Sequence, residues 1–227
     1  MKEQAEKMEK IIKTESRLRV SEIFYSIQGE SRTIGVPTTF VRLTGCPLRC
    51  TYCDTQYAFQ GGKWMTLDGI SDVVHSYNTP YVTITGGEPL AQPACEDLIE
   101  QLSNARFNVA VETSGALDVS AIDSRASIVM DLKTPGSGEV ERNLLANFAK
   151  LGQKDQIKIV LCHYEDYCWA KSIVKQHQLT KICEVIFSPS YHQLDPAHLA
   201  QWILDDQLQV RLQVQLHKIL WGEEQGK

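Results

Sequence analysis

The sequence predicts an α/β fold in which a mostly parallel sheet forms an incomplete barrel with helices on its outside. Short apolar segments rich in β-branched residues alternate with segments of helical periodicity along most of the chain, and this alternation is typical of parallel sheets. The predicted strand–helix units are too few for the eight of a complete (β/α) barrel. Polar residues follow several of these strands, and α/β folds place their functional sites at the carboxyl ends of strands.

The elements are predicted in chain order from their periodicity and their turn residues. A strand over residues 18–27 is followed by a strand over residues 38–43, and a helix capped by Thr66 runs to about Tyr77. The other predicted strands cover residues 81–85, 107–112, 127–131, 156–161, 181–187 and 208–214, and the other predicted helices lie near residues 90–104, 141–150, 164–176 and 196–204. We expect a single domain over residues 18–227 after a polar extension over residues 1–17.

The composition is that of a soluble globular protein, with 43% hydrophobic and 22% charged residues among 227. A formal net charge of −5 gives no basic surface for nucleic acid. The chain has no apolar segment long enough to span a bilayer, and its start, Met1-Lys2-Glu3-Gln4, lacks the pattern of a signal peptide. We therefore expect a cytoplasmic protein with no membrane partner, whose seven cysteines are reduced thiols or metal ligands.

One loop carries the strongest functional signal. Cys46, Cys50 and Cys53 follow the strand at 38–43 with the spacing Cys-x-x-x-Cys-x-x-Cys, and Tyr52 precedes the last cysteine. Three thiolates at this spacing suit one soft metal centre, and the absence of a fourth cysteine nearby leaves one coordination position for a non-protein ligand. A zinc knuckle completed by a distant histidine, a disulfide and unrelated buried thiols are the alternatives.

This loop resembles that of the radical S-adenosylmethionine (radical SAM) superfamily. The resemblance implies a [4Fe-4S] cluster held by Cys46, Cys50 and Cys53, whose remaining iron binds SAM, and it places Tyr52 beside the adenine. A second element, Gly86-Gly87-Glu88-Pro89, is an ordinary strand-to-helix turn when taken alone. Beside the cysteines it resembles the superfamily's Gly-Gly-Glu-Pro element, which implies SAM contacts at Gly87 and Glu88.

Other polar side chains close apolar strands. Arg42 alternates with Val41 and Leu43 and therefore points into the lumen if the apolar face packs on helices; a surface position at the sheet edge is the alternative. Glu112 ends another strand, and Asp131 and Lys133 end a third. Such residues are either surface strand ends or site residues, and their convergence at carboxyl ends of strands favours a site. Asp131 could hold a ribose hydroxyl or an ammonium group, and Lys133 could hold a carboxylate.

Several further motifs resemble the 7-carboxy-7-deazaguanine synthase family, over most of the chain after about residue 17. They are Glu22-Ile23-Phe24, Ile27-Gln28-Gly29-Glu30, Cys53-Asp54-Thr55, Thr85-Gly86-Gly87-Glu88-Pro89, Asp131-Leu132-Lys133 and Gln215-Leu216-His217-Lys218. The resemblance implies a lyase that contracts the ring of 6-carboxy-5,6,7,8-tetrahydropterin to 7-carboxy-7-deazaguanine with loss of ammonia, in queuosine and 7-deazapurine biosynthesis. It also implies a modified, incomplete barrel, a homodimer, a magnesium ion and an external one-electron reductant.

The same resemblance assigns roles to single residues. It implies SAM contacts at Tyr52, Cys53 and Asp54, a magnesium ligand at Thr55, and pterin contacts at Ile27, Gln28, Gly29, Arg42 and Thr85. Arg42 suits the substrate carboxylate because a guanidinium group binds carboxylates bidentately. A 5'-deoxyadenosyl radical would abstract the hydrogen at C6 of the pterin, and SAM would be regenerated, so no protein acid, base or nucleophile is assigned.

The remaining features leave choices open. His217 is a candidate contact, and the tail over residues 220–227 either reaches the substrate or lies in solvent. Cys95, Cys162, Cys168 and Cys183 are interpreted as packing residues. A glycyl-radical activase is the alternative enzyme, and a zinc- or cluster-binding interaction protein is the alternative without catalysis.

Overall fold

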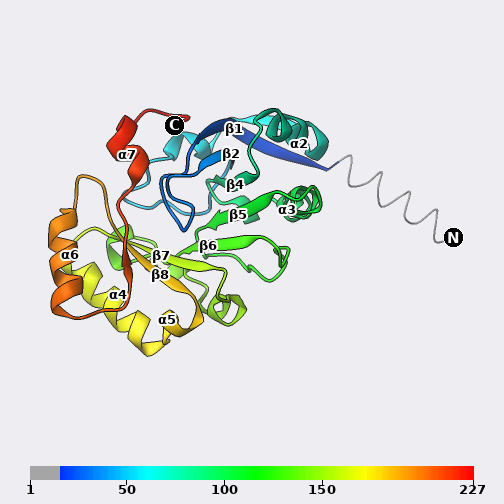
Figure 1. Ribbon diagram of the computed structural model, residues 1–227. Coiled ribbons are helices and arrows are strands. Elements are labelled where there is room, and N and C mark those ends of the chain that lie inside the picture. Colours follow the sequence, from blue (N-terminus) through cyan, green and yellow to red (C-terminus); the bar gives the residue numbers. More distant parts are fainter. Residues whose placement is uncertain (1–15) are drawn as a thin grey trace.

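The computed structural model describes residues 16–227, and within them nine strands form one open sheet (Figure 1). The order across the sheet is β3-β1-β2-β4-β5-β6-β7-β8-β9. β1 pairs antiparallel with β2 and β3, and every later pairing from β2 to β9 is parallel. The strands are β1 (Arg17–Ile27), β2 (Pro37–Leu43), β3 (Lys63–Thr66), β4 (Tyr81–Gly86), β5 (Asn108–Thr113), β6 (Ser127–Asp131), β7 (Gln156–Leu161), β8 (Glu184–Pro189) and β9 (Arg211–Leu212). The predicted mostly parallel, incomplete barrel is confirmed.

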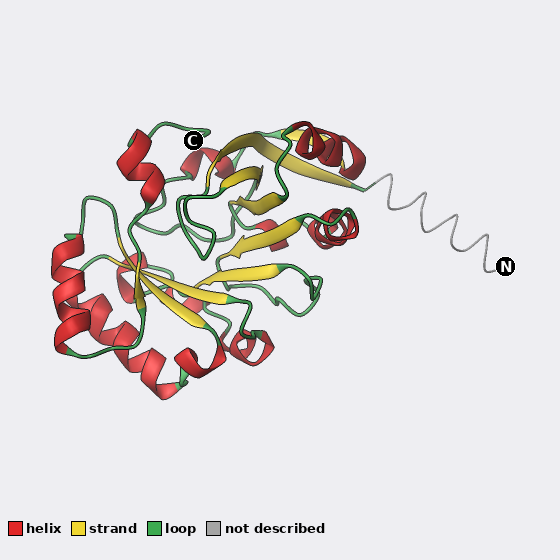
Figure 2. Cartoon of the chain, viewed as in Figure 1, coloured by secondary structure: helices red, strands yellow, loops and turns green. Residues whose placement is uncertain are grey.

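Helices lie around the outside of the curved sheet (Figure 2). They are α2 (Leu67–Ser76), α3 (Ala94–Asn104), α4 (Tyr164–Gln176), α5 (Leu179–Ile182), α6 (Pro196–Asp205) and α7 (Leu216–Trp221). The main core lies between sheet and helices, where Val41, Ile84 and Val111 share one hydrophobic cluster with Leu98 and Tyr167. No helix within residues 16–227 has the length and apolar character needed to cross a membrane.

Three segments differ from the sequence prediction. The helix expected at residues 141–150 is two 3-10 segments, Val140–Arg142 and Leu145–Lys150, because Asn143 and Asn147 donate their side-chain amides to the carbonyls of Lys133 and Leu117 and so compete with helical hydrogen bonding. The strand expected at 181–187 begins only at Glu184, after α5, and the strand expected at 208–214 is just Arg211–Leu212. β3 and α7 were not predicted, and most of the 1–17 extension lies outside the described residues.

Alternation along the parallel strands sorts side chains into two environments. Val41 and Leu43 of β2 face the outer core, whereas Phe40 and Arg42 face an inner cavity. On β7, Ile157 and Ile159 pack in the core and Lys158 lines the cavity. This follows from the period of two in a strand, and it places Arg42 in the lumen, as the sequence predicts.

The C-terminal segment closes the open side of the sheet against the loop after β1. Gln213 and Ser31 exchange two hydrogen bonds, of 2.6 Å from the Ser31 amide and 2.8 Å to the Ser31 carbonyl. The Leu216 amide donates to the Gly29 carbonyl over 3.0 Å. Figure 1 accordingly shows α7 and the C terminus near β1 and β2, and this places residues 213–217 beside a predicted binding loop.

Candidate active site

A cavity of about 460 Å³ lies at the carboxyl ends of the parallel strands. Every predicted site residue except Glu88 lines it. The lining therefore includes Ile27, Gln28, Gly29, Arg42, Cys46, Cys50, Tyr52, Cys53, Asp54, Thr55, Thr85, Gly87, Asp131 and Lys133. The chain thus brings the cysteine loop and the loop after β1 to the same space.

The three cysteines of the loop after β2 are free thiols, each partly buried. Burial raises the pKa of Cys50 to about 11 and also raises the pKa values of Cys46 and Cys53. In the described part of the chain, no three His, Cys, Asp or Glu side chains surround a single ion site. A four-iron cluster does not need such a site because each thiolate binds its own iron, so three cysteines on one cavity wall fit that group.

The Gly86-Gly87 turn fixes the cysteine loop from behind. Gly87 donates its amide to the Leu43 carbonyl over 3.1 Å, and Glu88 donates its amide to the Gly45 carbonyl over 2.7 Å. A Cβ atom at Gly87 would lie 2.1 Å from the Gly45 carbonyl oxygen, so only glycine permits this approach.

Glu88 is the exception among the predicted contacts, because its side chain is completely buried behind the cavity wall. Its carboxylate accepts hydrogen bonds from the Thr113 hydroxyl over 2.9 Å, the Ser114 amide over 2.7 Å and the Leu90 amide over 3.0 Å. The Ser114 hydroxyl donates to it as well, and four donors fill the acceptor sites of a carboxylate. Its observed role is to tie the turn after β4 to the end of β5.

Two buried oxygen atoms at the cysteine end of the cavity lack hydrogen-bond partners within residues 16–227. They are the Tyr52 hydroxyl and Oδ1 of Asp131. The other carboxylate oxygen of Asp131 lies 3.0 Å from Nζ of Lys133, and that ammonium group lies 5.6 Å from the centre of the Tyr52 ring. Buried polar atoms are rarely left unpaired, so both oxygens suit a polar ligand such as SAM.

Arg42 lines the same cavity from β2, and neighbouring side chains hold its guanidinium group in place. Its Nε donates to Glu22 over 2.7 Å, and its guanidinium carbon lies 5.5 Å from the Phe24 ring centre and 5.9 Å from that of Tyr57. Tyr57 donates its hydroxyl to the same Glu22 oxygen over 2.7 Å. This arrangement orients Arg42 through Nε and leaves its terminal nitrogens as the donors for a carboxylate.

Gln28 and Thr85 both donate hydrogen bonds to Glu112, a residue to which the sequence analysis gave no role. The Gln28 amide donates to the Thr83 hydroxyl over 3.1 Å and to Glu112 over 3.2 Å, and the Thr85 hydroxyl donates to the other Glu112 oxygen over 2.9 Å. Burial and the neighbouring Glu30 charge raise the pKa of Glu112. The carboxyl group of Glu112, which lines the cavity, therefore keeps its proton to a higher pH than an ordinary glutamate does.

The pKa of Glu30 is shifted in the opposite direction to that of Glu112. Burial opposes its ionisation, but the charges of Lys158 and His217, together with hydrogen bonds from Lys158 and Gln215, hold its pKa below the ordinary value. Lys158 lies 2.6 Å from one Glu30 oxygen, and the Gln215 amide donates to the other over 2.7 Å. Glu30 is therefore an ionised acceptor at the cavity wall.

His217 lies directly on the loop after β1. A Cβ atom at Gly29 would lie 2.1 Å from Nδ1 of His217, so the glycine makes room for the ring. Burial lowers the pKa of His217, which leaves it neutral near pH 7. The candidate contact at His217 therefore lines the cavity as a neutral ring.

The tail beyond α7 also reaches this cavity, since residues 222–227 contribute to its lining. Lys218 connects the tail region to the cysteine loop, with its Nζ 3.4 Å from Asp54. Asp54 in turn accepts a hydrogen bond of 2.7 Å from the Thr55 hydroxyl. Oxygen atoms of Asp54 and Thr55 thus lie at the cavity next to Cys53.

Replacing Glu112 with glutamine is expected to remove a loss of stability that the wild type undergoes as pH rises above 4.5, the ordinary pKa of a glutamate. The folded wild type holds this proton more tightly than the unfolded chain, so its stability falls as pH rises from 4.5 through the raised pKa. An amide does not titrate, and its NH₂ can donate to the Thr85 hydroxyl. Urea unfolding at several pH values from about 5 to about 8 measures the difference.

The difference in unfolding free energy between Glu112→Gln and wild type should grow with pH. Glu30 titrates in both proteins and so largely cancels in the comparison. A difference that stays constant across the range would show that Glu112 is ionised in the folded protein.

The sequence analysis assigned no site role to Glu30 or Lys158, and it noted Glu112 only as a polar residue at a strand end. Lys158 carried a usable signal, because it is the one charged residue in the apolar strand Gln156–Leu161. A charged side chain at an alternate position of such a strand points to the lumen. Glu30 stood inside the quoted Ile-Gln-Gly-Glu motif, and its partners lie more than one hundred residues away.

Comparison with known proteins agrees with this geometry. Residues 40–134 match the Radical SAM superfamily. A protein of Chlorobaculum tepidum named 7-carboxy-7-deazaguanine synthase is 44% identical over 214 residues, which cover 93% of this chain and 97% of that protein. A protein of Koribacter versatilis with the same name is 38% identical over 222 residues, which cover 91% of this chain and 98% of that protein.

A solved structure has the same fold. The crystal structure of QueE from Escherichia coli matches 92% of this chain and 98% of that chain with a TM-score of 0.70 at 22% identity. At this identity the likeness concerns the fold, and it supports the partial barrel described above.

Proposed function

The chain belongs to the 7-carboxy-7-deazaguanine synthase family of the radical SAM superfamily, and we propose that its cavity performs that family's ring contraction with the residues described above. The enzyme converts 6-carboxy-5,6,7,8-tetrahydropterin to 7-carboxy-7-deazaguanine with loss of ammonia. This membership favours the synthase over the glycyl-radical activase and over a non-catalytic zinc protein.

One observation carries the proposal: three cysteine thiols and a set of groups suited to a carboxylated pterin open into one cavity of about 460 Å³. Cavities of this size hold small-molecule ligands. A cluster alone would need only the cysteine wall. The lining also includes Arg42, Glu112 and Glu30, which form a second wall that suits another ligand.

At the first wall, Cys46, Cys50 and Cys53 would hold the [4Fe-4S] cluster. The cluster with SAM supplies one-electron chemistry that no side chain provides. Tyr52 and Asp131 present their unpaired oxygens toward SAM, and Lys133 suits its carboxylate. Gly87 keeps the turn close, and Asp54 borders the same space.

At the second wall, Arg42 binds the substrate carboxylate through its terminal nitrogens. Ile27 and Gly29 form the wall around the ring system, with His217 behind Gly29. Gln28 and Thr85 act through the Glu112 carboxyl group, which they hold by hydrogen bonds of 3.2 and 2.9 Å. A protonated Glu112 can donate a hydrogen bond to the pterin, and an ionised Glu30 can accept one.

Magnesium is the third expected group, and Thr55 is its proposed protein ligand. The hydroxyl of Thr55 lies at the cavity beside the Asp54 carboxylate, and magnesium is usually bound by few protein oxygens with substrate and water completing the shell. When bound, the ion orients the substrate and balances its charge. We also propose a cytoplasmic homodimer that receives electrons from an external reductant.

The deciding experiment is an anaerobic reaction of the cluster-loaded protein with SAM, magnesium, a one-electron reductant and the tetrahydropterin. Mass spectrometry should detect 7-carboxy-7-deazaguanine in the wild type. Arg42→Met should raise the KM for the pterin by about tenfold or more and leave the KM for SAM nearly unchanged, and Thr55→Val should raise the magnesium concentration needed.

Two results would count against the proposal. Formation of 5'-deoxyadenosine without the deazaguanine would retain the radical SAM assignment and reject the substrate. An unchanged KM for the pterin in Arg42→Met would reject the placement of the substrate carboxylate.

A further inference from the structure

Lys158 occupies a position in the cavity that no assigned role explains. It comes from β7, with its neighbours Ile157 and Ile159 packed in the outer core and its own side chain turned inward. The side chain is only 13% exposed. An ammonium group buried to this extent requires anionic partners.

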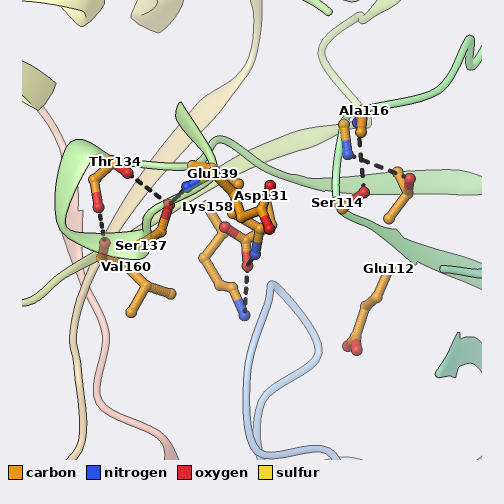
Figure 3. Close-up of polar contacts among 12 residues, drawn as sticks. Glu112, Ser114, Ala116, Asp131, Thr134, Ser137, Glu139, Lys158 and Val160 are labelled. Carbon is orange, nitrogen blue, oxygen red and sulfur yellow. Dashed lines mark hydrogen bonds and ion pairs between the residues drawn. The ribbon is translucent and has the colours of Figure 1, made fainter. Parts of the chain in front are cut away.

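Its two partners come from different parts of the chain. Nζ of Lys158 lies 2.6 Å from Glu30, in the loop after β1, and 3.8 Å from Asp131, at the end of β6. Figure 3 shows Lys158 meeting Asp131, while Glu112 extends to the same side of the sheet from β5. Lys158 therefore stands between the wall proposed for SAM and the wall proposed for the pterin.

Each carboxylate is held so that Lys158 completes its arrangement. Glu30 has Gln215 on one oxygen and Lys158 on the other. Asp131 has both Lys133 and Lys158 near Oδ2, so that Oδ1 stays unpaired and available. Without Lys158, Glu30 would lose its only ion-pair partner within residues 16–227, and Asp131 would keep Lys133 alone.

We propose that Lys158 is the positioning residue that holds Glu30 for the pterin and Asp131 for SAM at the same time. The inference rests on the proposed function, because it needs the two ligands to occupy the two walls. It predicts that one substitution weakens the binding of both ligands, whereas the residues around Lys158 each serve one.

The electrostatics agree with this placement. Burial disfavours the charged form of Lys158, but the carboxylates of Glu30 and Asp131 outweigh it and raise its pKa above the ordinary value. Other charged or titratable groups of the cavity lining include Lys133, Tyr52, Arg42, Asp54, Lys218 and His217. Among them, Lys133 pairs with Asp131 over 3.0 Å. Lys133 has no ion pair with Glu30 within the described chain. A substitution of Lys133 should therefore affect the binding of SAM alone, which makes it a suitable comparison.

The test measures binding without turnover. Cluster-loaded protein is kept anaerobic without reductant, and equilibrium dialysis gives the dissociation constants of SAM and of 6-carboxytetrahydropterin separately. Lys158→Met should weaken both by at least about tenfold, about 1.4 kcal/mol each, and Lys158→Arg should recover most of both losses.

Two comparison variants separate this role from general damage. Lys133→Met should weaken SAM alone. Lys150→Met removes a surface lysine that pairs with Asp118 over 2.6 Å outside the cavity, and it should change neither constant. If Lys158→Met acted only by damaging the fold, Lys158→Arg would not bring both dissociation constants back toward the wild-type values.

If Lys158→Met does not fold, the double variant Lys158→Gln with Glu30→Gln replaces it, because it leaves no lone charge at Glu30. The SAM constant then decides, since Glu30 faces the other ligand, and it should still rise about tenfold. The inference is overturned if both dissociation constants of Lys158→Met, or the SAM dissociation constant of the double variant, stay within about twofold of the wild-type values. It is also overturned if Lys158→Met changes the dissociation constant of only one of the two ligands. Failure of the proposed function looks different, because wild type itself would then not bind the pterin.

Discussion

Cys50→Ala is expected to abolish the [4Fe-4S] cluster and, with it, product formation. Cys50 is one of three free thiols that line the cavity from the loop after β2. Each thiolate of such a cluster binds a separate iron atom, and alanine offers no ligand in its place. The change is small in volume and the residue is only partly buried, so the fold should survive.

The measurement is iron and sulfide per chain after anaerobic reconstitution, followed by the product assay. Cys168→Ala is the matched control, because this partly buried cysteine lies on α4 outside the cavity. The control should keep wild-type iron, sulfide and product. Full iron and sulfide in Cys50→Ala would remove the cysteine loop from the cluster site.

The parts of the fold that the sequence predicted best are short, largely buried strands. The strands β2, β4, β6 and β7 are buried over most of their length, carry apolar residues on the core face, and were predicted nearly to their ends. Residues 141–150 were not, because two asparagine side chains bond to distant carbonyls and so replace helical hydrogen bonds. Tertiary contacts of this kind leave no local pattern.

The same distinction between local patterns and tertiary contacts holds for the site. The cysteine loop and the Gly86-Gly87 turn are local motifs, and the sequence placed both at one cavity. Glu88 shows the limit, because the motif does not say which side of the turn its carboxylate faces, and that depends on Thr113 and Ser114 of the next strand. The Glu30–Lys158 pair joins residues 128 positions apart and therefore could only be found in three dimensions.

Gly87→Ala is expected to disrupt the cluster site as severely as loss of a ligand, although Gly87 is not a ligand. A Cβ atom there would lie 2.1 Å from the Gly45 carbonyl oxygen, 2.5 Å from its carbonyl carbon and 2.9 Å from Cβ of Cys46. The obstacle is backbone, so no side-chain rotation can relieve it. Hydrogen bonds from Gly87 to Leu43 and from Glu88 to Gly45 join the same two segments, so relief must move the loop that carries Cys46.

Overpacking of this kind costs about 1–3 kcal/mol even where neighbours can yield, and here the displacement also falls on a cluster ligand. We therefore expect reconstituted Gly87→Ala to contain little iron and sulfide, to melt at a lower temperature and to form no detectable deazaguanine. Gly152→Ala is the control, because a Cβ atom there meets no atom closer than 4.0 Å, and it should behave as wild type. Normal iron content and turnover in Gly87→Ala would show that the cysteine loop can move away without losing its cluster, and that the contact with the turn does not set its position.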